Sequence, residues 1–345
     1  MHDFNYKDFP EKLLTMEIVA LMLDIRESKG RQLLLSKVKP DLLDAMLDDS
    51  LMKSTVSSNR IDGIATTDTR MRQIVSDGMA PCSHDERKIA GYISVLDVIR
   101  KQPENVDLTP ATICRMHREL FLDVPGVKGG EWKSDDVTLR DETSGFSFPT
   151  VSAKDTAAAV VDLCTAYNAA VKRRAYDPLL LTALFALDFL SIYPFEDGNG
   201  RVSRLLTNLL LSRSGYLVDN YVSIDDFIER SKKTYYDTLH TGSVGWHDNK
   251  HDPRPFVMYW LGVVLKAYQG LDGRIGDMTR RGLSKGDRIR EMFKVRIGKI
   301  TKRDILNACP DISETTAEVT LKSMLDSGEI RKIGGGRSTA YVAAE

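Results

Sequence analysis

Apolar residues recur at steps of three and four along most of the chain, which is the pattern of amphipathic helices packed on a core. The spacing predicts helices over residues 13–27, 30–47, 87–101, 153–173 and 177–192. A further helix is expected to begin at Pro110, because Thr109 can cap a helix start and proline is tolerated in the first turn. We therefore expect a mainly α-helical fold.

Two stretches depart from this pattern. Residues 123–150 contain four glycines and short β-type runs, which predict a hairpin or flap. Beyond residues 270–273 the pattern predicts helices over 285–293, 302–308 and 313–327, then two short strands around 334–336. That order is typical of a winged helix-turn-helix module. We expect an N-terminal helical region, a core domain and a small winged-helix domain over residues 1–103, 104–270 and 271–345.

Composition excludes several classes of protein. The net charge of −1 gives no reason to expect a globally basic nucleic-acid-binding protein. The four cysteines form no CxxC pair, so zinc-site and dithiol redox motifs have no support. The N-terminal residues lack the basic and apolar regions of a signal peptide, and the most apolar stretches are shorter than a membrane span. We therefore expect a soluble, cytoplasmic protein with no membrane partner.

The stretch most informative about chemistry is residues 191–204, which reads SIYPFEDGNGRVSR. An apolar helix is expected to end before Pro194, since proline disfavours helical geometry in the residue that precedes it. Gly198 and Gly200 then allow backbone conformations that other residues avoid. A second apolar helix is expected to begin near Arg201. The sequence thus predicts a helix, a glycine-rich turn and another helix.

Such a turn is a candidate anion site. The first turn of a helix presents unpaired backbone N–H groups and the positive end of the helix dipole. Asn199 adds a side-chain donor, and Arg201 and Arg204 offer planar guanidinium groups to phosphate oxygens. Asp197 is an acceptor at a place suited to a phosphate-bound Mg²⁺. Taken alone, the same residues also fit a helix–helix corner with a glycine turn and solvated arginines.

Taken whole, the stretch resembles the Fic motif, HxFx(D/E)GNGRxxR, at every position but the first. Residues 130–136, GEWKSDD, are similar to the family's Gly-x-Trp-Lys lead into its flap, and residues 231–236 and 245–247 match downstream signatures less closely. The resemblance covers roughly residues 50–345. It implies a Fic-type helical bundle with a β-hairpin flap. It also implies an enzyme that transfers a nucleotide monophosphate, usually AMP from Mg-ATP, to a protein hydroxyl of Ser, Thr or Tyr.

The resemblance assigns roles to residues of the loop. Asp197 would hold Mg²⁺, while Gly198, Asn199 and Gly200 would cradle the α- and β-phosphates. The two arginines of the motif would bind the outer phosphates. ATP and Mg²⁺ are therefore the expected ligands.

Residues outside the loop complete the implied site. Tyr235 and Tyr236 would lie near the adenine. The flap around residues 137–140 would hold the target segment as an added strand, a known mode of peptide recognition. The partner would be an unidentified target protein, and a homodimer is expected by analogy with the family alone.

Tyr193 occupies the first position of the motif, where the family has a histidine that accepts the proton of the attacking hydroxyl. Histidine suits that task because its pKa is near neutrality. A phenol with an ordinary pKa of ~10 is ionised in only about one molecule in a thousand at pH 7. Three interpretations stay open: a nucleotide-binding pseudoenzyme, a slow or autocatalytic adenylyltransferase, and an enzyme of different chemistry. The catalytic set implied by the motif is Tyr193, Asp197, Asn199, Arg201 and Arg204.

Other histidines offer little compensation for the missing base. His117 is expected to lie in a helix with a structural role. His247 and His251 are expected in a loop near the site, and nothing in the sequence shows that either one reaches it.

An upstream segment, residues 56–63 (VSSNRIDG), resembles the inhibitory helix of the family, [ST]xxxE[GN], with Ser58, Asp62 and Gly63 aligned. In the family the glutamate pairs with the second arginine of the loop, here Arg204, and prevents a productive ATP pose. Aspartate is one methylene shorter. It could reach Arg204 from a closer helix, leave the arginine free, or act only as a helix-end acceptor.

The C-terminal module leaves two roles open. Residues 281–345 hold 13 Lys and Arg against 9 Asp and Glu. The helix expected to enter a DNA groove presents Glu314 and Glu318 near its start, where donors are needed. Basic residues lie elsewhere, with Arg331, Lys332 and Arg337 beside the expected wing and five more over residues 294–303. DNA binding and a protein-docking or dimer role therefore both remain possible interpretations.

Overall fold

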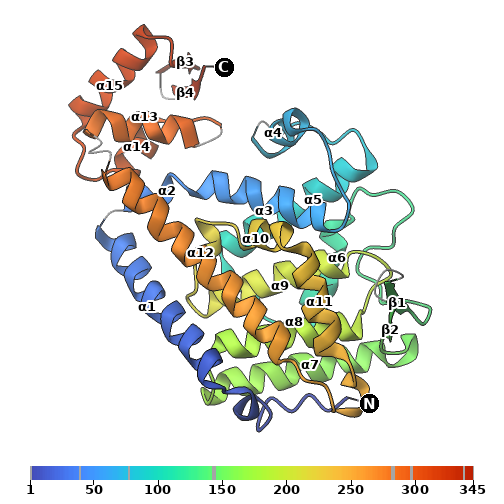
Figure 1. Ribbon diagram of the computed structural model, residues 1–345. Helices are drawn as coiled ribbons and strands as arrows, with labels where there is room; N and C mark the ends of the chain where they lie inside the picture. The colour runs from blue at the N-terminus through green and yellow to red at the C-terminus, as the bar shows by residue number, and fades with distance from the viewer. Residues whose placement is uncertain are drawn as a thin grey trace.

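The computed structural model describes residues 2–38, 40–76, 78–141, 145–280, 284–295, 298–336 and 339–344. These residues form many helices and two short antiparallel hairpins, so the predicted mainly α-helical fold is confirmed (Figure 1). No helix within these ranges is long and apolar enough to cross a membrane.

The main body runs from the N-terminal segment to the end of a long helix. Its α-helices are α1 (Met16–Val38), α2 (Pro40–Asp44), α3 (Leu47–Ile61), α4 (Asp68–Ser76), α5 (His84–Lys101), α6 (Pro110–Leu120), α7 (Ala153–Arg173), α8 (Pro178–Ile192), α9 (Asn199–Arg213), α10 (Ile224–Arg230), α11 (Lys232–Ser243) and α12 (Arg254–Arg280). Short 3₁₀ turns are η1 (Pro10–Leu13), η2 (Pro103–Asn105), η3 (Val218–Asn220) and η4 (Trp246–Asp248).

One hydrophobic core joins the N-terminal helices to those around the glycine-rich turn. Its buried residues extend from Phe4 to Ile275, so residues 1–103 and 104–270 share one core. α8 is central: every residue after Pro178 is buried, and the helix packs against α7, α9 and α12. A helix that is apolar on all sides is stable only when it is enclosed in this way.

The expectation of two helices over residues 13–27 and 30–47 is wrong. α1 passes through Gly30 without interruption, and α2 and α3 follow it. A glycine inside a helix costs about 1 kcal/mol relative to alanine, and the packing of α1 along α12 offsets that cost. The inhibitory-type segment, residues 56–63, comprises the C-terminal end of α3 and the two residues that follow it, Asp62 and Gly63.

Other predicted helix starts are found where expected. The Thr109 side chain accepts from the backbone N–H of Thr112, and Pro110 is the first residue of α6. Asp177 caps α8 in the same manner, by accepting from the N–H of Leu179. Local capping chemistry thus fixes both helix starts.

The predicted flap is a two-stranded hairpin. β1 (Thr138–Asp141) pairs antiparallel with β2 (Phe146–Pro149), with Leu139 opposite Phe148. The loop between the strands, residues 142–144, lies outside the described residues.

The C-terminal module has a hydrophobic core of its own, from Ile289 to Ile330. It consists of α13 (Lys285–Val295), α14 (Lys302–Ala308), α15 (Glu314–Asp326), β3 (Ile330–Ile333) and β4 (Ala340–Ala343), the predicted winged-helix order. The predicted boundary at residue 270 falls inside α12, which continues to Arg280. Arg337, expected beside the wing, lies outside the described residues.

Candidate active site

The loop at residues 193–198 joins α8 to α9 and lies at the centre of the candidate site. Tyr193 follows the last residue of α8 in a left-handed conformation, with φ 53°, and Gly198, with φ 80°, precedes α9. The Asn199 side chain closes the loop on Phe195, accepting from its N–H at 2.9 Å and donating to its carbonyl at 2.8 Å. The Asn199 side chain therefore shapes the loop, and its expected role as a phosphate donor stays a prediction.

Asp62 and Arg204 form an ion pair beside this loop. Asp62 Oδ1 lies 3.0 Å from Arg204 Nη2. The same guanidinium donates from Nε to Ser58 Oγ at 2.6 Å and from Nη2 to Ser58 O at 2.8 Å. Burial lowers the pKa of Arg204, but nearby carboxylates, Asp62 first, outweigh it and raise the pKa overall. The shorter aspartate thus reaches the second arginine of the motif.

Two glycines allow Asp62 to take this position. Asp62 ends α3, and Gly63 follows with φ 78°. The N–H groups of the two residues after Asp62 donate to carbonyls in the last turn of α3, the Schellman arrangement that favours glycine. In the facing first turn of α9, a Cβ at Gly200 would lie only 2.9 Å from Asp62 Oδ1. Glycine at that position therefore lets the carboxylate approach the start of α9.

Arg201 is fully buried behind the loop. Its Nε lies 3.6 Å from Asp62 Oδ2, and its guanidinium lies 5.0 Å from the centre of the Phe121 ring. Within the described part of the chain, none of its three guanidinium nitrogens has a hydrogen-bond partner. Burial lowers the pKa of Arg201, although Asp62 and Asp197 oppose this. Arg201 thus holds positive charge and unused donors under the candidate anion site.

Asp197 projects from the loop with about half of its side chain exposed and pairs with a lysine from α5. Lys88 Nζ lies 2.8 Å from Asp197 Oδ2. Asp197 Oδ1 accepts from the N–H of Gly198 at 2.6 Å. Burial raises the pKa of Asp197, but Lys88 and Arg201 outweigh it, so the pKa is lowered overall. The carboxylate is therefore ionised at neutral pH, as a metal ligand must be.

His117, on α6, connects the flap lead to the loop. Its Nδ1 accepts from the N–H of Gly130 at 2.8 Å, and its Nε2 donates to the carbonyl of Asp197 at 3.0 Å. The ring stacks on Phe195, with centroids 3.8 Å apart. Burial lowers the pKa of His117 to about 4. The neutral imidazole therefore serves as a structural link, as predicted.

Tyr193 points into a cavity of about 1130 Å³ that opens beside the loop. The cavity is bounded by the loop, the flap and α11, and its lining includes Asp62, Leu139, Tyr193, Asp197, Gly198, Asn199, Gly200, Arg204, Tyr235 and Tyr236. The predicted phosphate, flap and adenine residues are thus brought together. Arg201 is the exception, because it lies behind the lining.

The environment of Tyr193 makes its phenol a poorer base than free tyrosine. Burial raises its pKa, and the carboxylates of Asp62 and Asp197 add to this rise, while a hydrogen bond with Asn199 opposes it. The phenol is therefore protonated at neutral pH and serves as a hydrogen-bond donor or acceptor.

The flap is held against this cavity by contacts that the sequence did not indicate. Lys133, in the flap lead, donates to Thr150 Oγ1 at 2.7 Å and to the carbonyl of Ile192 at 3.0 Å. Phe146 stacks on His240 of α11, with ring centroids 3.8 Å apart. The Gly-x-Trp-Lys match pointed to Lys133 as a residue of the site. No local sequence pattern indicated that Lys88 or His240 would lie there.

The two downstream histidines do not line the cavity. His247 Nε2 lies 2.6 Å from the carbonyl of Pro149, at the end of the flap. His251 is buried near His2 and Asp188. Neither histidine therefore lies where it could replace the histidine that the Fic motif has at the position of Tyr193.

Comparisons with known proteins agree with this geometry. The Fic/DOC family model matches residues 107–211, and a model described as "Transcriptional regulator DIP2311-like, C-terminal domain" matches residues 292–343. The chain is 27% identical over 245 residues to "Protein adenylyltransferase Fic" of Drosophila melanogaster, covering 67% of this chain and 46% of that protein. It is 31% identical over 111 residues to "Protein adenylyltransferase fic-1" of Caenorhabditis elegans, covering 32% and 20%. The matched part thus spans about half or less of these relatives.

Solved structures share the fold. A Fic family protein from Desulfovibrio desulfuricans G20 superposes with a TM-score of 0.64 at 20% identity, covering 96% of this chain and 97% of that one. A Fic domain containing signaling protein from Bacteroides thetaiotaomicron VPI-5482 gives 0.63 at 25% identity, covering 71% and 94%. The family-model match shows a Fic/DOC family domain over residues 107–211 of the chain, and these solved structures share its fold.

Proposed function

We propose that this protein binds Mg-ATP in the cavity beside the loop and transfers AMP to protein hydroxyls, slowly and under restraint from Asp62. The observation that carries the proposal is the cavity itself. A glycine-rich helix start, the buried Arg204 and a flap line one space of about 1130 Å³, with Arg201 buried behind the lining. Volumes of this order accommodate a nucleotide-sized ligand.

Asp62 supplies the restraint. Its carboxylate occupies Arg204 at 3.0 Å, so an anionic phosphate must compete with a fixed anion for the same guanidinium. The Arg204 guanidinium also donates to two oxygens of Ser58, Oγ and the backbone carbonyl. The arginine therefore faces the cavity, but its donors already have partners. ATP can therefore bind with its outer phosphates displaced, which is an unproductive pose.

The donor chemistry of the loop fits Mg²⁺. Mg²⁺ prefers hard oxygen ligands and is commonly bound by one or two carboxylates together with phosphates and water. Asp197 offers such a carboxylate, half exposed and ionised. When bound, the ion would neutralise developing charge on the phosphates. Lys88 Nζ lies 2.8 Å from Asp197 Oδ2, so Lys88 would have to move away from this oxygen or share it with the ion.

Transfer without a histidine remains chemically feasible. Phosphoryl-type transfer depends largely on positioning and charge stabilisation, and the loop supplies both. Loss of a general base costs about 10²–10⁴-fold, so we expect slow turnover. The phenol of Tyr193 would orient the attacking hydroxyl or a phosphate rather than accept a proton.

Calorimetric titration of the wild-type protein with Mg-ATP tests nucleotide binding. We expect measurable binding, about tenfold or more weaker in Arg204→Ala because the positive charge that offsets Asp62 beside the phosphates is lost. The matched control is Arg254→Ala, which removes an exposed arginine paired with Asp252 at the start of α12. Absence of ATP binding in folded wild-type protein, or equal binding in the two variants, would contradict the proposal.

The C-terminal module supports a second candidate, a nucleotide-binding regulator that has lost transfer and acts through its winged helix. The regulator-like match over residues 292–343 favours it. At the start of α15, however, Glu314 and Glu318 both pair with Lys302, at 2.6 and 2.8 Å. Because Lys302 is engaged there, we expect weak, salt-sensitive DNA binding at most. Tight, sequence-selective DNA binding that changes with ATP would favour this second candidate.

A further inference from the structure

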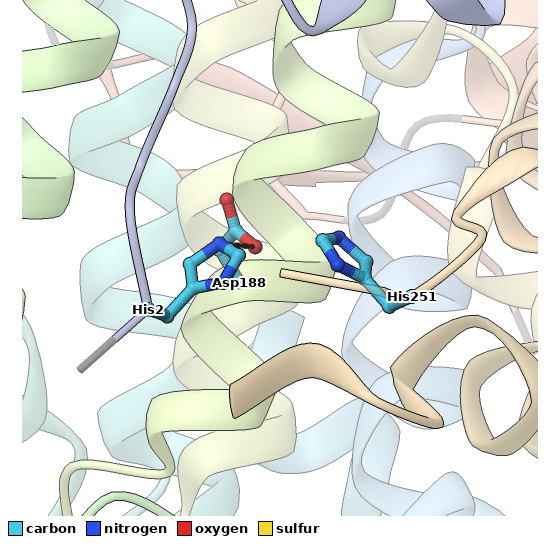
Figure 2. A group of neighbouring side chains, drawn as sticks. All are labelled: His2, Asp188 and His251. Carbon is cyan, nitrogen blue, oxygen red and sulfur yellow. Dashed lines mark ion pairs between the residues drawn. The ribbon is translucent and has the colours of Figure 1, made fainter. Parts of the chain in front are cut away.

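Apart from the nucleotide cavity, three buried polar side chains meet beneath the N-terminal segment (Figure 2). His2 comes from the extended segment before η1, Asp188 from α8 and His251 from the loop before α12. Their exposed fractions are only 8%, 4% and 8%. One potential ligand atom from each lies within 4.8 Å of the other two. Segments far apart in sequence thus place two imidazoles and a carboxylate together.

The hydrogen bonds of His2 direct a nitrogen lone pair at Asp188. His2 Nδ1 lies 2.8 Å from the carbonyl of Trp246, which can only accept, so Nδ1 carries the proton. Nε2 faces Asp188 Oδ1 at 3.6 Å, too far for a hydrogen bond. A protonated Nε2 would donate to this carboxylate, so the missing hydrogen bond indicates a lone pair on Nε2. A lone pair facing a carboxylate is stabilised by a cation between them.

His251 contributes an unpartnered buried atom. Its Nδ1 has no hydrogen-bond partner among the residues described. Figure 2 shows the ring turned toward Asp188. A buried polar nitrogen left without a partner destabilises the fold, and coordination of a cation would remove that penalty.

Asp188 is oriented as metal-binding carboxylates are. Trp246 Nε1 donates to its Oδ1 at 2.7 Å, and the Tyr6 hydroxyl donates to its Oδ2 at 2.8 Å. Such outer hydrogen bonds fix ligands around metals.

We propose that His2, Asp188 and His251 bind one divalent transition-metal ion and that Zn²⁺ is the ion these donors suit. Imidazole nitrogens and carboxylate oxygens are zinc ligands. Two ligands 2.0–2.1 Å from a tetrahedral ion lie about 3.4 Å apart, close to the 3.6 Å between His2 Nε2 and Asp188 Oδ1. His251 moves inward on binding, and a water molecule completes the tetrahedron.

The ion would fasten the N-terminal segment to the helix that leads to the active loop. Asp188 lies in α8, whose last turn precedes Tyr193, and His251 lies just before α12. One ion would therefore join three separate segments of the main body.

The test uses the full chain without a polyhistidine tag, stripped by a chelator and then titrated with Zn²⁺ against a chromophoric competitor. We expect one equivalent of Zn²⁺ to bind and to raise the unfolding temperature, by mass action on the folded state. In His251→Gln we expect affinity to fall by ~100-fold or more, since even supporting residues around metals are worth 10–100-fold. His84→Ala, which removes an exposed histidine on α5, should bind as the wild type does.

Replacement of Zn²⁺ by Co²⁺ distinguishes this cluster from the free cysteines. A site of two imidazoles and one carboxylate gives the visible absorption of four-coordinate Co²⁺ without a thiolate charge-transfer band. No Zn²⁺ binding, or binding unchanged in His251→Gln, would overturn the proposal. Thiolate bands would overturn it as well, because they would place the metal on cysteine.

Discussion

The phenol of Tyr193 lies where the Fic motif has an imidazole, in a cavity that also holds Asp62 and Asp197. Since burial and these carboxylates raise its pKa, the wild-type protein should lack a base near neutral pH. Tyr193→His should increase AMP transfer by ~10²–10⁴-fold. The rate of this variant should rise with pH through the pKa of histidine, near 6.5. Initial rates with labelled ATP across pH 5–9 measure both effects.

Tyr193→Phe is the control for that comparison. Removing the hydroxyl should change the slow wild-type rate by less than about tenfold if the phenol only orients groups. Fast transfer by the wild type that is abolished in Tyr193→Phe would show that the phenol participates directly.

Asp62 neutralisation should release the nucleotide site at some cost in stability. Asp62→Asn keeps the size of the side chain and removes the charge facing Arg204. We expect ATP affinity to rise by about tenfold, because the phosphate no longer competes with an anion. The unfolding free energy should fall by about 2 kcal/mol, since a buried guanidinium loses its partner but keeps Ser58. Calorimetry measures the ATP affinity, and chemical denaturation measures the unfolding free energy. An unchanged ATP affinity would contradict the proposal that Asp62 restrains the site.

His117 should make the domain sensitive to acid. Its pKa is lowered to about 4, against ~6.5 in the unfolded chain, so the folded state binds fewer protons between these values. The contribution of neutral His117 to the unfolding free energy is fully present above pH 6.5 and is lost as the pH falls toward 4. The total loss is about 3 kcal/mol. Thermal unfolding of His117→Asn should therefore depend less steeply on pH between 7 and 4.5. An identical slope in wild type and variant would contradict this.

At the scale of elements, the end of α3 positions the Asp62 carboxylate, which we propose restrains the site. Gly63 has φ 78° and open space around its Cα, so alanine there meets only the backbone penalty of about 1–2 kcal/mol. We expect Gly63→Ala to destabilise the fold by about that amount and to raise ATP affinity as Asp62 shifts. Gly30→Ala is the matched control: it lies inside α1, also in open space, and should stabilise by ~0.5–1 kcal/mol. Equal effects of both substitutions would contradict the role of the left-handed turn.

Elements fixed by local chemistry could be predicted from sequence, whereas their partners could not. The cap at Thr109, the hairpin and the glycine-rich turn each depend on neighbouring residues, and all three are found as expected. The pairing of Lys88 with Asp197 joins residues 109 apart, and Arg204 meets Ser58 across 146. The spacing of apolar residues along the chain does not predict contacts between residues so far apart in sequence. The family resemblance indicated the Asp62 pairing as one alternative, but its distance depended on how α3 packs.

At the scale of the whole molecule, the separate hydrophobic core of the C-terminal module predicts more than one unfolding transition. The cluster from Ile289 to Ile330 is separate from that of the main body. The parts meet where Arg288 pairs with Asp41. Scanning calorimetry should therefore resolve two transitions, the smaller one from the winged-helix module. A single transition with equal calorimetric and van't Hoff enthalpies would show instead that the parts unfold as one.

The most direct test of the central claim, restrained AMP transfer by an intact Fic loop, is intact mass after incubation with Mg²⁺ and ATP. Wild-type protein, Asp62→Asn and the double variant Asp62→Asn/Arg204→Ala would be compared. We predict slow addition of one adenylyl group to the wild type, faster addition to Asp62→Asn and none to the double variant. No mass gain in folded Asp62→Asn protein that binds ATP would contradict transfer and make the protein a nucleotide-binding regulator.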